Sequence, residues 1–122
     1  MVKKKILVID DEEDIVKTIS FRLNSLGYEV ITAENGFDGF EKAQREKPNL
    51  ILLDVMMPEI DGFEVLRRLR SDQATKYTPV IMLTGKGESE SLFKAYNLGS
   101  TDYIIKPFKM QELLDSVKRY VE

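Results

Sequence analysis

The stretch Leu50-Ile-Leu-Leu-Asp54-Val-Met-Met-Pro58 decides the fold of this chain. Four consecutive aliphatic residues are typical of a strand that is buried on both faces, as in a parallel sheet covered by helices. The strand ends on a carboxylate, and open α/β sheets place their chemistry at the carboxyl ends of their strands. Taken alone, an aspartate at such a place is more often a turn former or a helix cap. The role of Asp54 therefore depends on the residues around it.

The rest of the chain repeats the pattern of a strand followed by a helix. Aliphatic runs at residues 5–10, 80–84 and 102–107 predict three further strands, and a more polar strand at 28–33 is expected nearer a sheet edge. Helical patterns follow each predicted strand. They occupy the segment between the first strand and Gly27, residues 37–46, the segment that begins at Asp61, residues 89–98 and residues 110–121. Strands that alternate with helices predict a parallel sheet covered on both faces, with right-handed crossovers. We therefore expect an α/β fold, a doubly wound (βα)5 sandwich with a five-stranded parallel sheet, as a single domain over residues 1–122.

Two helical patterns indicate which side chains face the sheet. In the first helix the apolar face consists of Ile15, Ile19, Leu23 and Leu26. These residues recur at spacings of three and four, so we expect them to be buried. A capping box of Asp61 and Glu64 is expected to start the third helix. The outward side chains of that helix are predicted to be Arg67, Arg68 and Arg70.

The composition excludes several classes of function. The chain has 122 residues with no cysteine and no histidine, which excludes disulfides, thiolate or histidine metal ligands, and nucleophiles of either type. A formal net charge of -3 gives no reason to expect a nucleic-acid or membrane partner. No apolar run approaches the length of a membrane span and no signal peptide is recognised, so we expect a cytoplasmic location.

Four of the predicted strands end on polar side chains. Asp10 with Asp11 follows the first strand, and the others end on Asp54, Thr84 and Lys106. Because the carboxyl ends of parallel strands lie at one edge of the sheet, we expect these side chains to meet. Each has an ordinary structural explanation as a cap, a strand end or a solvated lysine. Their joint placement favours a functional site instead.

Three carboxylates, a hydroxyl and an ammonium at one edge suit phosphoryl chemistry. Clustered carboxylates repel one another unless a cation is present, and an all-oxygen site favours a hard cation, Mg²⁺ or Mn²⁺. A carboxylate between a divalent ion and an ammonium is suited to attack a phosphoryl group, because both cations neutralise the phosphoryl oxygens. Asp54 would then become an aspartyl phosphate.

The polar strand ends belong to a longer set of motifs: Asp10-Asp11, Asp54 with Val-Met-Met-Pro58 and Asp61-Gly62, Thr84-Gly85, and Lys106-Pro107-Phe108. In this order and spacing, the set resembles the receiver domain of two-component response regulators, of the chemotaxis (CheY-like) type. The resemblance covers the whole chain. It implies a flavodoxin-like sandwich with strand order 2-1-3-4-5, acting as a phosphorylation-activated signalling switch.

The resemblance implies a role for each matched residue of the site. Asp54 matches the phosphoacceptor, and Asp11 matches a direct ligand of Mg²⁺. Asp10 matches the acidic neighbour, which acts mostly through metal-bound water. Met56 matches the position whose main-chain carbonyl also binds the metal. Lys106 matches the lysine that pairs with the phosphoryl group, and the bond from it to the next residue, a proline, is expected to be cis.

Four residues are implied in switching and in the lifetime of the phosphoryl group. Thr84 matches the hydroxyl that moves toward the phosphoryl group, and Tyr103 matches the aromatic ring that then rotates inward. Met56 and Lys86 each follow a site residue by two positions and flank the path of the hydrolytic water in the family. We therefore expect these two residues to tune hydrolysis.

The partners implied by the resemblance are proteins. A sensor histidine kinase or a phosphotransfer protein would supply the phosphoryl group. A downstream effector would contact the surface of residues 89–98, 102–106 and 110–121, and no direct nucleic-acid or membrane partner is expected. The domain would catalyse only its own phosphorylation and dephosphorylation. We expect a monomer or a phosphorylation-dependent dimer, standing alone or as part of a longer regulator.

Other classes of protein are disfavoured by particular residues. A pseudo-receiver, an interaction module that is never phosphorylated, usually lacks one of the acids or the lysine, and this chain has them all. A phosphatase with an aspartate nucleophile would have a second acid two residues further on, where this chain has Met56. A nucleotide-binding domain would have a Gly-x-Gly-x-x-Gly or Walker lysine motif after the first strand.

Overall fold

The computed structural model describes residues 2–85, 94 and 96–121, which form one five-stranded parallel sheet with helices on both faces. The strands are β1 (Lys5–Ile9), β2 (Glu29–Ala33), β3 (Leu50–Asp54), β4 (Val80–Gly85) and β5 (Asp102–Lys106). The helices are α1 (Glu13–Ser25), α2 (Gly36–Glu46), α3 (Gly62–Ser71) and α5 (Met110–Val121). The helix predicted at 89–98 lies mostly outside the described residues. Among the described helices, none is long and apolar enough to cross a membrane.

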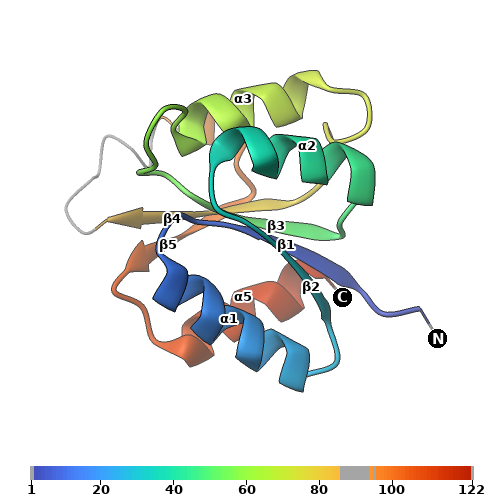
Figure 1. The fold of residues 1–122 in the computed structure, drawn as a ribbon, viewed down its shortest axis with the longest axis vertical. Helices are drawn as coiled ribbons and strands as arrows, with labels where there is room; N and C mark the ends of the chain where they lie inside the picture. Colours follow the sequence, from blue (N-terminus) through green and yellow to red (C-terminus); the bar gives the residue numbers. More distant parts are fainter. Residues whose placement is uncertain (1, 86–93, 95, 122) are drawn as a thin grey trace.

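The strand order is β2-β1-β3-β4-β5, and every neighbouring pair is parallel, which confirms the predicted fold. Strand β2 lies at one edge and is only partly buried, as its more polar sequence predicted. Helices α2 and α3 cover one face of the sheet, and α1 and α5 cover the other (Figure 1). The carboxyl ends of the strands therefore lie at one rim of a sheet whose two faces are covered by helices.

Strands β1 and β3, two of the three inner strands, hold the rim in place because their side chains are buried on both faces. Alternate residues of a strand point to opposite sides of the sheet. The side under α2 and α3 receives Leu7, Ile9, Ile51 and Leu53. The side under α1 and α5 receives Ile6, Val8, Leu50 and Leu52. All eight side chains are fully buried, and each contributes about 1.5–3 kcal/mol to folding.

Polar caps fix where two helices begin. The Asn35 side chain accepts a hydrogen bond from the Asp38 amide at 2.8 Å, so α2 begins one residue earlier than the predicted start. The Asp61 side chain accepts one from the Glu64 amide at 2.9 Å, which confirms half of the predicted capping box. The Glu64 carboxylate does not complete the box, because it pairs with two arginines of its own helix.

Two helical side chains depart from their predicted faces. Leu26 is 48% exposed, because α1 ends at Ser25 and the next residue no longer follows the helical path. Arg70 does not point out into water. Its guanidinium donates hydrogen bonds to the carbonyl oxygens of Thr78 at 2.8 Å and Gly99 at 2.9 Å. Arg70 therefore ties the end of α3 to the segments that precede β4 and β5.

Candidate functional site

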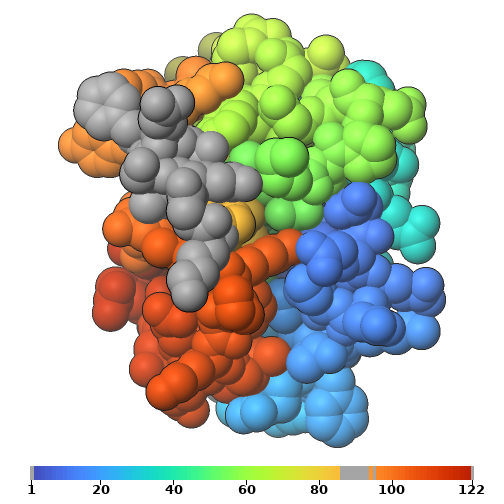
Figure 2. Space-filling model, turned by 90° about the vertical axis from the view of Figure 1, so that its left-hand side faces the viewer, coloured from blue at the N-terminus to red at the C-terminus, as the bar shows by residue number. Residues whose placement is uncertain are grey.

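Parallel pairing brings the polar strand ends to one rim of the sheet, as the sequence predicted. Asp54 pairs with Leu83 on the neighbouring strand, so Thr84 lies one position beyond it. Figure 2 looks onto this rim. The segment that follows β1 (blue), the loop that follows β3 (green) and the segment that leads from β5 into α5 (orange) converge there (Figure 2). Residues that are far apart in the sequence thus form a single site.

The ammonium of Lys106 connects three carboxylates at this rim. Its Nζ lies 2.9 Å from Asp10 Oδ2, 3.0 Å from Glu12 Oε1 and 3.2 Å from Asp54 Oδ1. Burial alone would lower the pKa of this ammonium. Hydrogen bonds to Asp10 and Glu12, together with the charges of Asp54 and Asp10, raise the pKa of Lys106 instead. The lysine is therefore a permanent cation at the site. Its peptide bond to Pro107 is cis, as the resemblance implied.

Asp54 is a buried carboxylate with a strongly shifted pKa. Only 3% of the residue is exposed. Burial and the nearby charge of Asp10 raise the pKa of Asp54 to about 7, although Lys106 acts in the opposite direction. The ammonium of Lys106 alone thus does not offset the effects of burial and of Asp10 on Asp54. A further cation at the site would favour the charged form of Asp54.

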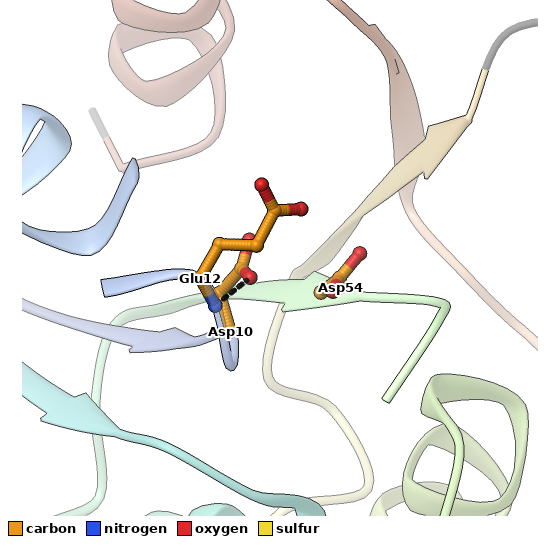
Figure 3. A group of neighbouring side chains, drawn as sticks. All are labelled: Asp10, Glu12 and Asp54. Carbon is orange, nitrogen blue, oxygen red and sulfur yellow. Dashed lines mark hydrogen bonds between the residues drawn. The ribbon is translucent and has the colours of Figure 1, made fainter. Parts of the chain in front are cut away.

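The carboxylates of Asp10, Glu12 and Asp54 form a group that could hold this cation. One oxygen from each lies within 4.8 Å of the others. Figure 3 shows them at the ends of β1 and β3, with the Glu12 amide hydrogen-bonded to the Asp10 carboxylate. Their donor atoms are all oxygens, which suits a hard divalent ion. The acidic cluster is therefore capable of binding a metal ion.

No motif in the sequence pointed to Glu12 as a site residue. The side chain of Asp11 lies apart from those of Asp10 and Glu12. The Asp11 side chain is exposed and stands outside the group of three carboxylates. Its charge still contributes to the raised pKa of Asp54, as the smallest of the causes. The only signal for Glu12 was its place in the acidic run after β1, which does not show where its side chain points.

The remaining predicted residues have separate positions at or near the rim. Thr84 is 1% exposed, and its hydroxyl has no hydrogen-bond partner among the described residues. The Met56 side chain is 65% exposed, and Tyr103 is 46% exposed on the outer surface of β5. Lys86 lies outside the described residues. The buried Thr84 hydroxyl is therefore available to donate a hydrogen bond to a ligand, because an orphaned buried hydroxyl is unfavourable.

Comparison with known proteins identifies one family for this chain. The family model described as the response regulator receiver domain matches residues 6–118. The chain belongs to the response regulator receiver domain family. The solved structure of the chemotaxis protein CheY4 from Vibrio cholerae superposes with a TM-score of 0.92 at 34% identity, covering 98% of this chain and 99% of that one.

Curated relatives of this receiver domain differ in length. It is 47% identical over 115 residues to the alkaline phosphatase synthesis transcriptional regulatory protein PhoP of Bacillus subtilis, covering 94% of this chain and 47% of that protein. It is 40% identical over 117 residues to Protein PilG of Pseudomonas aeruginosa, covering 96% of this chain and 87% of that protein. The chain spans about half the length of several curated relatives that it matches. The receiver domain itself is a phosphorylation-type signalling switch.

Proposed function

We propose that Asp54 accepts a phosphoryl group from a sensor histidine kinase or a phosphotransfer protein. The observation that carries this proposal is the contact of Lys106 with Asp54, a buried carboxylate that lies beside those of Asp10 and Glu12. A carboxylate beside a fixed ammonium is a nucleophile with a cation already placed for the phosphoryl oxygens. A carboxylate oxygen of Asp54 forms the new bond to phosphorus. The phosphorus–nitrogen bond of the donor's phosphohistidine breaks, and the released imidazole nitrogen keeps the electron pair and takes up a proton.

The metal that we propose for the acidic cluster is Mg²⁺, or Mn²⁺ in its place. Asp10 and Asp54 would hold it, and the family resemblance adds Asp11 and the main-chain carbonyl of Met56. The all-oxygen donor set and the raised pKa of Asp54 support this choice. When bound, the ion would neutralise negative charge on the phosphoryl oxygens.

Thr84 and Tyr103 are proposed as the switch. A phosphoryl group brings a charge of about -1.5 to -2 and three strong acceptor oxygens. The Thr84 hydroxyl lacks a partner in the described resting domain, so it can donate to a phosphoryl oxygen at no loss of an existing bond. Tyr103 is exposed and can turn into the space that the threonine leaves. The surface of residues 89–98, β5 and α5 would change shape and be recognised by a downstream effector.

An apolar cavity beside the site supports a protein as the phosphoryl donor. The cavity has a volume of about 420 Å³ and lies between α1 and the start of α5. Ile15, Ile19 and Phe108 line it together with Lys106. A protein donor can bury apolar side chains in this cavity while its phosphohistidine reaches Asp54. A small phosphate compound would make no use of it.

The wider role follows from the family. We propose a single receiver domain over residues 1–122 that works in the cytoplasm, alone or within a longer regulator. It would be a monomer or a phosphorylation-dependent dimer. It would catalyse only its own phosphorylation and dephosphorylation, with Met56 and Lys86 tuning the second reaction. No direct contact of this domain with nucleic acid or with a membrane is proposed.

Acetyl phosphate with Mg²⁺ tests the proposal, followed by intact-mass spectrometry. Wild-type protein should gain the mass of one phosphoryl group, and omission of Mg²⁺ should abolish the gain. Asp54→Asn should gain none. Asp38→Asn, which removes an exposed carboxylate paired with Lys42, should behave like wild type. A wild type without phosphoryl uptake would favour the pseudo-receiver, and rapid turnover of an unrelated phosphoester would favour the phosphatase.

A further inference from the structure

We propose that Glu12 is a positioning residue that holds Lys106 in the resting domain and gives it up when Asp54 is phosphorylated. The inference rests on the proposed function, because it concerns how the lysine becomes available to the phosphoryl group. It assigns a role to a residue that no sequence motif of the site contained.

The donors of the Lys106 ammonium are fully used in the resting domain. An ammonium has three N–H groups and can donate three hydrogen bonds. Asp10, Glu12 and Asp54 take one each, at 2.9, 3.0 and 3.2 Å. The lysine side chain is only 15% exposed, so water has little access to it. A phosphoryl oxygen can therefore bind Lys106 only in place of one of these three carboxylate oxygens.

Glu12 is the carboxylate that leaves most easily. Asp10 is fully buried, and its second oxygen accepts a hydrogen bond from the Glu12 amide at 2.9 Å. Asp54 is the residue that carries the phosphoryl group, so it stays at the site in both states. The Glu12 side chain is 57% exposed, and its carboxylate can exchange the lysine for water. Water can solvate the exposed Glu12 carboxylate once it is released, so losing this contact costs less than losing the contact with either buried carboxylate.

The local backbone leaves the Glu12 side chain free for this role. Glu12 occupies the cap position before α1, but its side chain makes no capping hydrogen bond. Its carbonyl oxygen accepts the first helical bond, from the Val16 amide at 3.1 Å. The start of α1 thus depends on the main chain of Glu12 and not on its carboxylate. Release of Lys106 would leave the helix intact.

Glu12→Gln, with Glu13→Gln as its matched control, tests this role. Glu13 is the next residue, it loses the same charge on substitution, and its carboxylate pairs with the exposed Lys17 at 3.0 Å. Each protein is titrated with Mg²⁺ by calorimetry. At saturating Mg²⁺, beryllofluoride, a phosphoryl mimic, is then titrated and followed by the rise in unfolding temperature.

We expect Glu12→Gln to lower the half-saturating beryllofluoride concentration about threefold relative to Glu13→Gln, the size of a weak exposed ion pair. The Mg²⁺ affinities of the two variants should agree. Glu12→Ala, which leaves no side-chain acceptor, should show at least the same shift.

Equal beryllofluoride responses in the Glu12 and Glu13 variants would overturn the role of Glu12 alone. A tenfold loss of Mg²⁺ affinity confined to the Glu12 variants would also overturn it, because Glu12 would then be a metal ligand. If beryllofluoride did not raise the unfolding temperature of the wild-type protein, that result would contradict the proposed function as well.

Discussion

A Cβ atom on Gly62 would stand 2.2 Å from the main-chain oxygen of Asp54, closer than any two such atoms can approach. The first residue of α3 therefore packs directly against the backbone of Asp54, the proposed phosphoacceptor. The Gly62 amide also donates to the Val55 carbonyl oxygen at 2.9 Å. The start of α3 thus fixes the end of β3 from outside the sheet, and only glycine leaves room for this contact.

Gly62→Ala should lower the free energy of unfolding by about 1–3 kcal/mol, because the new methyl group meets rigid backbone. Urea unfolding followed by circular dichroism measures the loss. Gly39→Ala is the comparison, since a Cβ there would meet only the side chain of Ile9, at 2.6 Å. We expect a smaller loss for Gly39→Ala. A larger loss for Gly39→Ala than for Gly62→Ala would contradict the proposed contact.

Asp54→Asn should stabilise the metal-free domain at neutral pH. The folded state raises the pKa of Asp54 to about 7 from an ordinary value of 3.8, so the folded protein holds a proton that the unfolded chain has lost. Between these two pKa values, the stability that the protonated form of Asp54 contributes to the folded state is lost as the pH rises. Asparagine cannot ionise, so its advantage should grow from pH 4 to pH 8.

The gain at pH 8 should be of the order of 2 kcal/mol, less than the full pKa shift implies, because the substitution also removes a partner of Lys106. Unfolding in urea at several pH values, with a chelator present, measures it. If the stability difference between Asp54→Asn and wild type were the same at pH 4 and pH 8, the pKa of the Asp54 carboxyl would not be raised in the folded state.

Arg70→Ala should destabilise the domain although the helical pattern placed this arginine outside. Its hydrogen bonds to the carbonyl oxygens of Thr78 and Gly99 involve a charged donor, so their loss should cost about 1.5–3 kcal/mol. Arg67→Ala is the control, because Arg67 is exposed and its guanidinium pairs with Glu64 of the same helix. That change should stay within about 0.5 kcal/mol. Thermal unfolding compares the two, and equal midpoints would refute the anchoring role.

The backbone of the site could be predicted because four of the five strands are largely aliphatic and are followed by or end on a polar side chain. Parallel pairing then brings Asp10, Asp54 and Lys106 together whatever their separation in sequence. Hydrophobic pattern is a strong signal for this, since it reports which face of each element is buried.

The missed contacts depend on where individual side chains point, which the hydrophobic pattern does not report. Glu12 lies between the end of β1 and the start of α1, where no periodicity predicts an orientation. Arg70 lies on a helix, but its long side chain bends back to carbonyl groups, as arginine stems can. Leu26 continued the apolar spacing of α1 beyond the residue at which the helix ends. The hydrophobic pattern predicts the helices and strands, whereas these contacts depend on how the folded elements come together.

Two buried threonines should respond in opposite ways to the same change. The Thr75 hydroxyl donates to the Leu69 carbonyl oxygen at 2.7 Å, whereas the Thr84 hydroxyl has no partner in the described part of the chain. Thr75→Val should therefore lose about 1–2 kcal/mol of stability, and Thr84→Val should gain up to about 1 kcal/mol. At saturating Mg²⁺, beryllofluoride should raise the unfolding temperature of Thr75→Val as it does that of wild type, and should raise that of Thr84→Val less. A destabilised Thr84→Val with a full beryllofluoride response would mean that its hydroxyl serves the resting fold and not the phosphoryl group.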